Sequence, residues 1–198
     1  MRIFTEKEAE NFLKKNGFKI FKGIYIHKKI ELERVLKNFE FPVVMKVSGE
    51  KIIHKKKING VVVGVSNFEE AKSTFEKLIK IKDAEEVLIQ EQISGKEFFL
   101  GIKKTPEFEH VLVFGRGGTD VEEKKQVVFR VCSVLEKKDI QEMFKELKIE
   151  KNNCLEKNIF KLCGLVKKFP EISELDINPF FMQKNLVGKI ADARVIWE

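Results

Sequence analysis

The stretch ELDINPFFMQKNLVGKIADARVIW, residues 174–197, predicts a β-ribbon with polar side chains gathered at one end. Side chains in a strand alternate between two faces. Leu175 and Ile177 are therefore expected to face a core, while Asp176 and Asn178 share the opposite face. The rest of the chain is interpreted outward from this ribbon.

The ribbon is expected to turn back and bring two oxygen ligands together. Lys184-Asn185 is typical of a tight turn, and residues 186–190 are typical of a returning strand. That return moves Asp192 towards Asn178, so that a carboxylate and an amide oxygen converge. Such oxygens suit Mg²⁺, which completes its shell with water and nucleotide phosphates. Taken alone, the pattern favours an ordinary polar face towards water.

The composition is that of a folded chain large enough for one domain or two small lobes. The 198 residues carry a formal net charge of +7, which leans towards an anionic ligand. Lys and Glu are interleaved, however, as on a solvated surface, and abundant Lys and Glu is also a thermophile signature. The dense basic runs, 55–57 and 124–125, are short, so nucleic-acid binding is not expected.

The cysteines and the hydropathy pattern favour a cytoplasmic protein. Cys132, Cys154 and Cys163 form no C-x-x-C pair and no metal-binding spacing, so reduced thiols are expected. No apolar run approaches membrane-spanning length, and the N-terminus lacks the apolar region of a signal peptide. We therefore expect no membrane association.

The first part of the chain alternates helix and strand patterns. Thr5–Glu8 is a capping box, and it predicts a helix that ends at Asn16-Gly17. Residues 1–86 are expected to form a small α/β lobe that includes this leading helix. Its other predicted elements are strands at 18–26, 42–47 and 60–65 and helices at 32–39 and after Asn67.

The second part, residues 87–198, is expected to form another mixed lobe. It would begin with an apolar strand from Val87 to Ile93 and end with the ribbon. Between them we expect strands at 98–102, 110–114 and 127–131 and helices at 138–147 and 154–168. A cleft between two such lobes is a common place for a ligand.

Four side chains have a chemical use as well as an ordinary structural one. Lys46 interrupts an apolar strand, where it either guards a sheet edge or directs a charge at phosphate. His54 lies in a lysine-rich loop and is by itself more typical of a surface residue than of a phosphoryl acceptor. Glu91 and Glu97 flank a hinge and could bind ribose hydroxyls, although solvated hairpin acids are commoner.

A glycine-rich loop, Gly115-Arg116-Gly117-Gly118, could cradle an anion with its backbone N–H groups. Arg116 or Arg130 would add positive charge. The loop is equally suited to turning the chain, and Arg130 is also plausible as the ion-pair partner of Glu122.

Four segments together resemble the β subunit of archaeal ADP-forming acetyl-CoA synthetase, an acyl-CoA synthetase of the ATP-grasp family. The segments are FPVVMKVSGEKIIHKKKINGVVVGV, VLIQEQISGKEFFLGIKKTPEF, VLVFGRGGTDVEEKKQVVFR, and SELDINPFFM with ADARV. They follow the family's order and spacing and cover most of residues 5–196. The resemblance implies one α/β (α+β) ATP-grasp domain over 1–198, with nucleotide held between two mixed lobes.

The resemblance also implies roles for individual residues. His54 would relay phosphate, with Arg130 as a second catalytic group. The implied binding residues are Lys46, Glu91, Ile93 and Glu97 for ATP or ADP, Gly115, Gly117 and Gly118 for phosphate, and Asn178 and Asp192 for Mg²⁺.

The implied reaction is acyl-CoA + ADP + phosphate ⇌ acid + CoA + ATP. In the family, a histidine on a partner α subunit is phosphorylated and then swings to the ATP-grasp site. This chain carries no G-x-G-x-x-G fingerprint and no CoA-binding half. An α subunit is therefore expected as partner, in a cytoplasmic hetero-oligomer that we expect to be a heterotetramer.

Two departures from the family pattern keep alternatives open. Acids that the family has near Lys57 and at Gln126 are missing here, which affects phosphate relay more than nucleotide binding. The alternatives are a β-like subunit of a succinyl-CoA synthetase and a non-catalytic nucleotide-binding scaffold subunit. A basic nucleic-acid-binding module is a more distant one.

Overall fold

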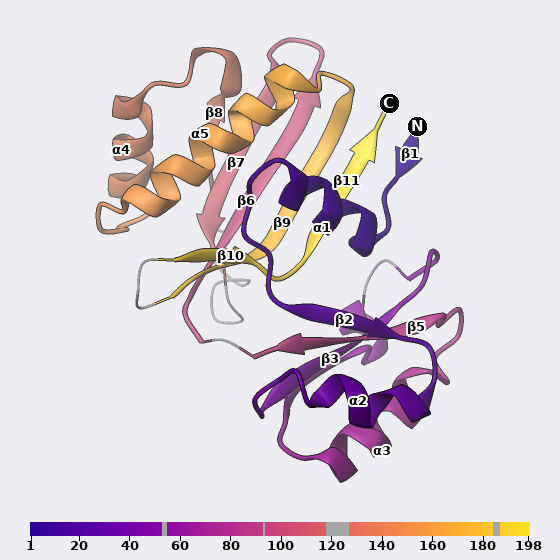
Figure 1. The fold of residues 1–198 in the computed structure, drawn as a ribbon. Coiled ribbons are helices and arrows are strands. Elements are labelled where there is room, and N and C mark those ends of the chain that lie inside the picture. Colours follow the sequence, from indigo (N-terminus) through magenta and orange to yellow (C-terminus); the bar gives the residue numbers. More distant parts are fainter. Residues whose placement is uncertain (53–54, 93, 118–126, 184–186) are drawn as a thin grey trace. The chain divides into compact units, whose positions relative to one another are not determined.

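The chain forms two compact units, and each is built around its own antiparallel sheet. The computed structural model describes residues 1–52, 55–92, 94–117, 127–183 and 187–198 (Figure 1). The larger unit contains Met1–Ile20 and Ser94–Glu198, and the smaller unit contains Phe21–Ile93. Among the described residues, no helix has the length and apolar content needed to cross a membrane.

The smaller unit packs two α-helices against one face of a four-stranded sheet of order β2-β5-β3-β4. Met45 and Val47 of β3 face the helices, so Lys46 and Ser48 face the other side, as the alternation predicts. The elements are β2 (Gly23–Ile26), η1 (Lys29–Glu31), α2 (Leu32–Leu36), β3 (Val43–Ser48), η2 (Lys55–Ile58), β4 (Val61–Val65), α3 (Phe68–Leu78) and β5 (Glu86–Glu91).

The larger unit is a seven-stranded sheet of order β1-β11-β9-β6-β7-β8, with β10 paired to β9. Its strands are β1 (Arg2–Ile3), β6 (Lys96–Thr105), β7 (Glu109–Arg116), β8 (Val127–Val131), β9 (Ile172–Met182), β10 (Gly188–Ile190) and β11 (Ala193–Trp197). Its helices are α1 (Glu6–Lys15), η4 (Cys132–Val134), α4 (Lys137–Glu146) and α5 (Asn153–Lys168).

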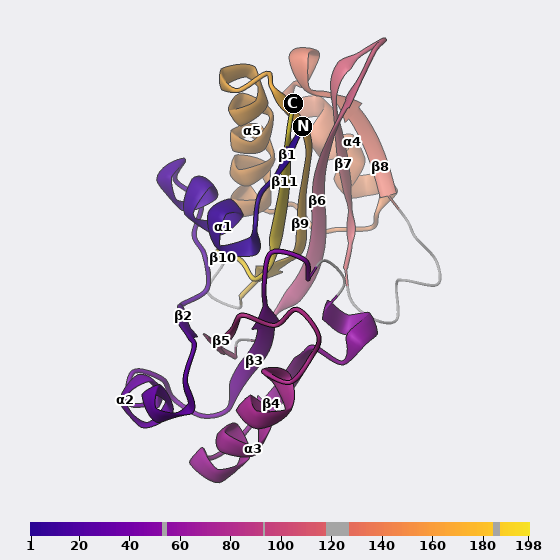
Figure 2. The same cartoon turned by 90° about the vertical axis from the view of Figure 1, so that its right-hand side faces the viewer.

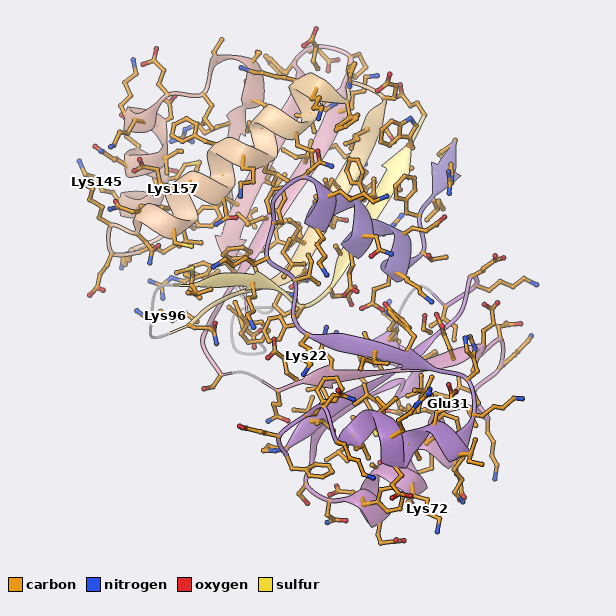
Figure 3. The ribbon with its side chains drawn as sticks, viewed as in Figure 1. Lys22, Glu31, Lys72, Lys96, Lys145 and Lys157 are labelled. Atoms are coloured by element: carbon orange, nitrogen blue, oxygen red, sulfur yellow. A yellow bond between two sulfur atoms is a disulfide. The ribbon has the colours of Figure 1, made fainter. Side chains whose placement is uncertain are left out.

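One face of this larger sheet carries the core. Leu100, Leu112 and Leu175 are fully buried and pack with apolar residues of α1, α4 and α5. In the edge-on view, α1 and α5 lie on one side of the strands (Figure 2). Lys145 of α4 and Lys157 of α5 project away from the sheet on the outer side of these helices (Figure 3). The opposite face of the sheet bears the site described below.

The predicted lobe boundary at residues 86 and 87 is wrong in two respects. The leading helix has the predicted capping box at Thr5, but Ala9 and Leu13 bury themselves in the core of the larger unit. The apolar strand predicted to open the second lobe is β5, which pairs with β2 and β3 of the smaller sheet. An apolar run indicates that a strand is buried, but it does not indicate to which sheet the strand belongs.

The prediction of three reduced thiols is also wrong for two of them. Cys132 and Cys163 form a disulfide with a Cα–Cα distance of 5.0 Å, while Cys154 is free. The two residues are 31 positions apart in sequence and come together because η4 and α5 both pack on β7. Both are almost fully buried in the core of the larger unit.

Candidate functional site

Asn178 and Asp192 meet at one end of the β9–β11 ribbon, as the sequence predicts. The Asn178 backbone N–H donates to the Asp192 carbonyl at 3.1 Å, and Ile177 lies opposite Ala193 in the next register pair. The returning strand is β10, which pairs with residues 180–182. The predicted turn at 184–185 lies outside the described residues.

This pair fits a Mg²⁺ ion that is bound together with a phosphate ligand. Asn178 is exposed and Asp192 is half-buried, so an amide oxygen and a carboxylate are both available. The described residues contain no group of three or more His, Cys, Asp and Glu that could hold a metal by themselves. Mg²⁺ commonly binds through one or two protein oxygens and takes the rest of its shell from water and phosphate.

Asp176 lies on the same face as Asn178, in a row that crosses three strands. It pairs with Gly101 of β6 on one side and Arg194 of β11 on the other. A Cβ atom on Gly101 would lie 3.2 Å from Asp176 Oδ1 and 2.8 Å from the Phe99 ring. The absence of a side chain at residue 101 therefore makes room for the Asp176 carboxyl.

The pKa of Asp176 is raised to about 6, mainly by burial and then by the neighbouring Glu174 carboxylate. Arg194 and Lys103 oppose this shift but do not cancel it. Beside Asn178 and Asp192, the protein thus holds a carboxyl group that can gain or lose a proton slightly below neutral pH.

The raised pKa predicts that Asp176→Asn stabilises the metal-free protein at neutral pH. The pKa of Asp176 is 3.8 in the unfolded chain and about 6 in the folded chain. As pH rises from 3.8 to 6, the unfolded state therefore loses this proton before the folded state does, and the free energy of unfolding decreases. A full shift would be worth about 3 kcal/mol, and partial solvent access reduces this to about 2 kcal/mol.

This expectation is measured by urea unfolding in EDTA at pH 4 and pH 7. At each pH, the unfolding free energy of wild type is subtracted from that of Asp176→Asn. This difference should be about 2 kcal/mol larger at pH 7 than at pH 4. Glu107→Gln, in the exposed β6–β7 turn, is the control and should show no such change. An equal difference at both pH values would show that Asp176 is not perturbed.

Glu97 and the start of the glycine loop lie together on the larger unit. The Gly117 N–H donates to the Glu97 carbonyl at 2.8 Å, and a Cβ atom on Gly117 would come within 3.2 Å of Glu97 backbone and side-chain atoms. Gly115 pairs with Phe99 two residues further along the same strands. Glycine at 117 thus permits close approach of the two strands. Gly118 lies outside the described residues.

The side chains of Arg116 and Arg130 contact α4 and its C-terminal end, and their predicted roles beside the glycine loop stay predictions. Arg130 pairs in register with buried Leu112, which places it on the helix-covered face of the sheet. There its guanidinium donates to Glu146 of α4 at 2.5 Å. Arg116 donates from Nε to the Leu147 carbonyl at the end of α4 at 2.9 Å. Both arginines therefore link the β7–β8 strands to α4.

The smaller unit carries the predicted lysine. Lys46 is only 6% exposed, on the face of the sheet turned away from α2 and α3. It lies next to Ser48, whose hydroxyl donates to Glu86 Oε1 at 3.4 Å. A lysine this buried is not guarding a sheet edge, since β3 is paired on both sides. Its charge thus lies in a low-dielectric setting, where it acts more strongly than in water.

Glu91 ends β5 and is held by backbone groups. Its Oε1 accepts from the Lys22 N–H at 2.8 Å, and its own N–H donates to the Lys22 carbonyl. The carboxylate is therefore fixed against the segment that directly precedes β2. His54 and Ile93 lie outside the described residues, so the structure does not test their predicted roles.

The class of protein follows from the fold together with a family comparison. A family model described as an ATP-grasp domain matches residues 1–196, and this chain belongs to that family. The predicted fold class, a mixed α/β ATP-grasp fold, is confirmed.

Within this family, the similar proteins are ADP-forming CoA ligases. The acetate–CoA ligase (ADP-forming) I subunit beta of Pyrococcus furiosus is 32% identical, over 98% of this chain and 92% of that protein. The acetate–CoA ligase (ADP-forming) II of Archaeoglobus fulgidus is 33% identical over 98% of this chain. The chain spans only 30% of the length of the latter.

Solved structures agree with these sequence comparisons. The acetyl-coenzyme A synthetase 1 of Ca. Korarchaeum cryptofilum, in complex with coenzyme A and Ca-AMPCP, superposes with a TM-score of 0.88 at 26% identity. The match covers 100% of this chain and 94% of that chain. The homologues are thus the β subunits and ATP-grasp regions of ADP-forming acetyl-CoA synthetases.

Proposed function

We propose that this chain is the nucleotide-binding β subunit of an ADP-forming acid–CoA ligase. In the reaction acyl-CoA + ADP + phosphate ⇌ acid + CoA + ATP, it would accept a phosphoryl group from a histidine of its partner and pass it to ADP. The observation that carries the proposal is the convergence of Asn178 and Asp192, with the Asp176 carboxyl on the same face. An ATP-grasp relative from P. furiosus, named a β subunit, supports it.

Each of several described residues has a proposed role in nucleotide binding. Asn178 and Asp192 would hold Mg²⁺, which neutralises charge on the nucleotide phosphates. The buried ammonium of Lys46 would act as a second point charge for phosphate, strengthened by its low exposure. Glu97, and Glu91 with its fixed carboxylate, are the proposed nucleotide contacts at the ends of β6 and β5.

The proposal requires a partner. The chain corresponds to less than a third of the A. fulgidus ligase, so we propose that acyl-CoA chemistry is carried by a part of the enzyme other than these residues. We propose an α subunit with CoA-binding and phosphohistidine domains, joined with this chain in a heterotetramer in an archaeal cytoplasm.

Calorimetric titration of the purified protein with ADP tests nucleotide binding directly. Mg²⁺ should tighten ADP binding by at least about tenfold, because the Asn178–Asp192 oxygens contribute only through a bound cation. Affinity for ADP that is the same in EDTA and in Mg²⁺ would contradict the metal role of this pair.

The second candidate is a nucleotide-binding scaffold without phosphoryl transfer, motivated by the missing acids near Lys57 and at Gln126. The variant His54→Asn in the reconstituted complex separates the two functions. We expect ATP formation to fall by at least about 100-fold while ADP affinity is unchanged, because only the relay is removed. Undiminished ATP formation would exclude a relay role for His54.

A further inference from the structure

Arg194 faces the polar side of the larger sheet, where the proposed metal pair lies. Its neighbours Ala193 and Val195 pack into the core on the helix-covered side, so strand alternation turns Arg194 to the other side. There it lies opposite Asp176 in the β9–β11 register and two residues beyond Asp192. Residues two apart in a strand are separated by about 7 Å, which a long arginine side chain can span. Arg194 can therefore reach a ligand that is bound at Asp192.

The guanidinium of Arg194 has a donor that the fold leaves without an acceptor. Its Nε–H is buried, and none of the described residues accepts a hydrogen bond from it. Lys103, the other cation near Asp176, differs in this respect, because its Nζ lies 3.5 Å from Glu174 Oε2. A buried N–H group without an acceptor is rare in native proteins and calls for a functional explanation. The donor therefore points to a ligand with oxygen acceptors.

A phosphoryl group is the ligand whose chemistry fits this donor. Arginine presents a planar fork of N–H groups that matches two oxygens of a phosphate, and it stays charged over the whole physiological pH range. Mg²⁺ held by Asn178 and Asp192 would bind phosphate oxygens one register pair away from Arg194. A metal ion and a guanidinium placed side by side stabilise the charge that develops on a transferred phosphoryl group.

The order of groups along β9 indicates which phosphate Arg194 would meet. Glu97, a proposed nucleotide contact, lies opposite Phe181, and the metal pair follows at Asn178. Arg194 lies further along the strand in the same direction, opposite Asp176. A nucleotide with its nucleoside end at Glu97 and its phosphates on the metal would therefore direct its last phosphate towards Arg194.

We propose that Arg194 contacts the phosphoryl group that is transferred, in the place that the third phosphate of ATP occupies. This inference rests on the proposed function. In the ATP-forming direction, the bond between phosphorus and the partner's histidine nitrogen breaks, and a bond forms between phosphorus and a terminal oxygen of ADP. The imidazole nitrogen takes up a proton from water. Arg194 keeps its protons throughout and donates hydrogen bonds to the phosphoryl oxygens, so it makes this contact with ATP but not with ADP.

Calorimetric titration of the full chain with Mg-ATP and with Mg-ADP tests this role in Arg194→Gln. Mg-ATP affinity should fall by at least about tenfold, as for the loss of a hydrogen bond to a charged group. Mg-ADP affinity should change by less than about twofold, because ADP lacks the phosphate that Arg194 contacts. The matched control is Arg34→Gln, the same change at an exposed arginine of the smaller unit, and it should leave both affinities unchanged.

Urea unfolding in EDTA establishes that the variant is folded. If Arg194→Gln does not fold, Arg194→Lys is used, since lysine keeps the charge but lacks the fork, and it should also lose Mg-ATP affinity selectively. A ratio of Mg-ATP to Mg-ADP affinity that equals that of wild type would overturn the role of Arg194, whether both affinities fall together or neither changes. That result would leave the proposed function standing. Wild-type protein that binds neither nucleotide in Mg²⁺ would contradict the proposed function, and the role of Arg194 with it.

Discussion

Asp192→Ala should weaken Mg-ADP binding by about 100-fold, and Asn178→Ala should weaken it to a similar extent. Removing a group that only orients a metal ligand already lowers metal affinity by about 10–100-fold. Removing a direct ligand should lower affinity by the upper end of this range, which corresponds to about 2.7 kcal/mol of binding free energy. ADP binding in EDTA should be nearly unchanged in both variants, because without the cation these oxygens make no favourable contact with phosphate. Calorimetry of the isolated protein measures both quantities.

The control for these variants is Glu107→Ala, an exposed acid in the same unit. It should bind Mg-ADP like wild type. If Asp192→Ala and Asn178→Ala both kept wild-type affinity in Mg²⁺, the pair at the ribbon end would not be the metal site.

Reduction of the Cys132–Cys163 disulfide should cost the larger unit about 3–4 kcal/mol of unfolding free energy. The bond closes a loop over a sequence separation of 31, and the chain-entropy model assigns that loop a stabilisation of this size. Trp197, the single tryptophan, lies in the larger unit and reports its unfolding by fluorescence. Urea unfolding with and without a phosphine reductant gives the difference.

The matched variants are Cys132→Ala with Cys163→Ala, and Cys154→Ala. The double variant should unfold at the same urea concentration with and without reductant. Cys154→Ala should retain the full response of the wild-type protein, since Cys154 is free. Three titratable thiols in the native, unreduced protein would contradict the bond.

The ribbon was predictable because strand parity and a short return fix its geometry. Alternation across Leu175–Asn178 put Asp176 and Asn178 on one face, and the return of the chain put Asp192 beside Asn178, as the structure confirms. The raised pKa of Asp176 was not predictable, because it depends on burial and on Glu174 in the folded sheet.

Other features depend on contacts that sequence patterns do not specify. In the β8 sequence VVFRV, one parity is wholly apolar and the other contains Arg130. This alternation favours burial of Phe129, whereas in the structure Arg130 faces α4 and Phe129 is exposed. The placement of β5 in the smaller sheet depends on pairing with β2 and β3, which an apolar run leaves open. The disulfide joins residues with no motif spacing.

The most direct test of the proposed function is transfer of phosphate from the partner to ADP. The α subunit is phosphorylated on its histidine with radiolabelled phosphate, freed of small molecules, and mixed with this protein, ADP and Mg²⁺. The proposal predicts that label moves from protein to ATP, and that Asp192→Ala slows this transfer by at least about 100-fold. Label that remains on the α subunit, in a complex that has assembled and bound Mg-ADP, would contradict it.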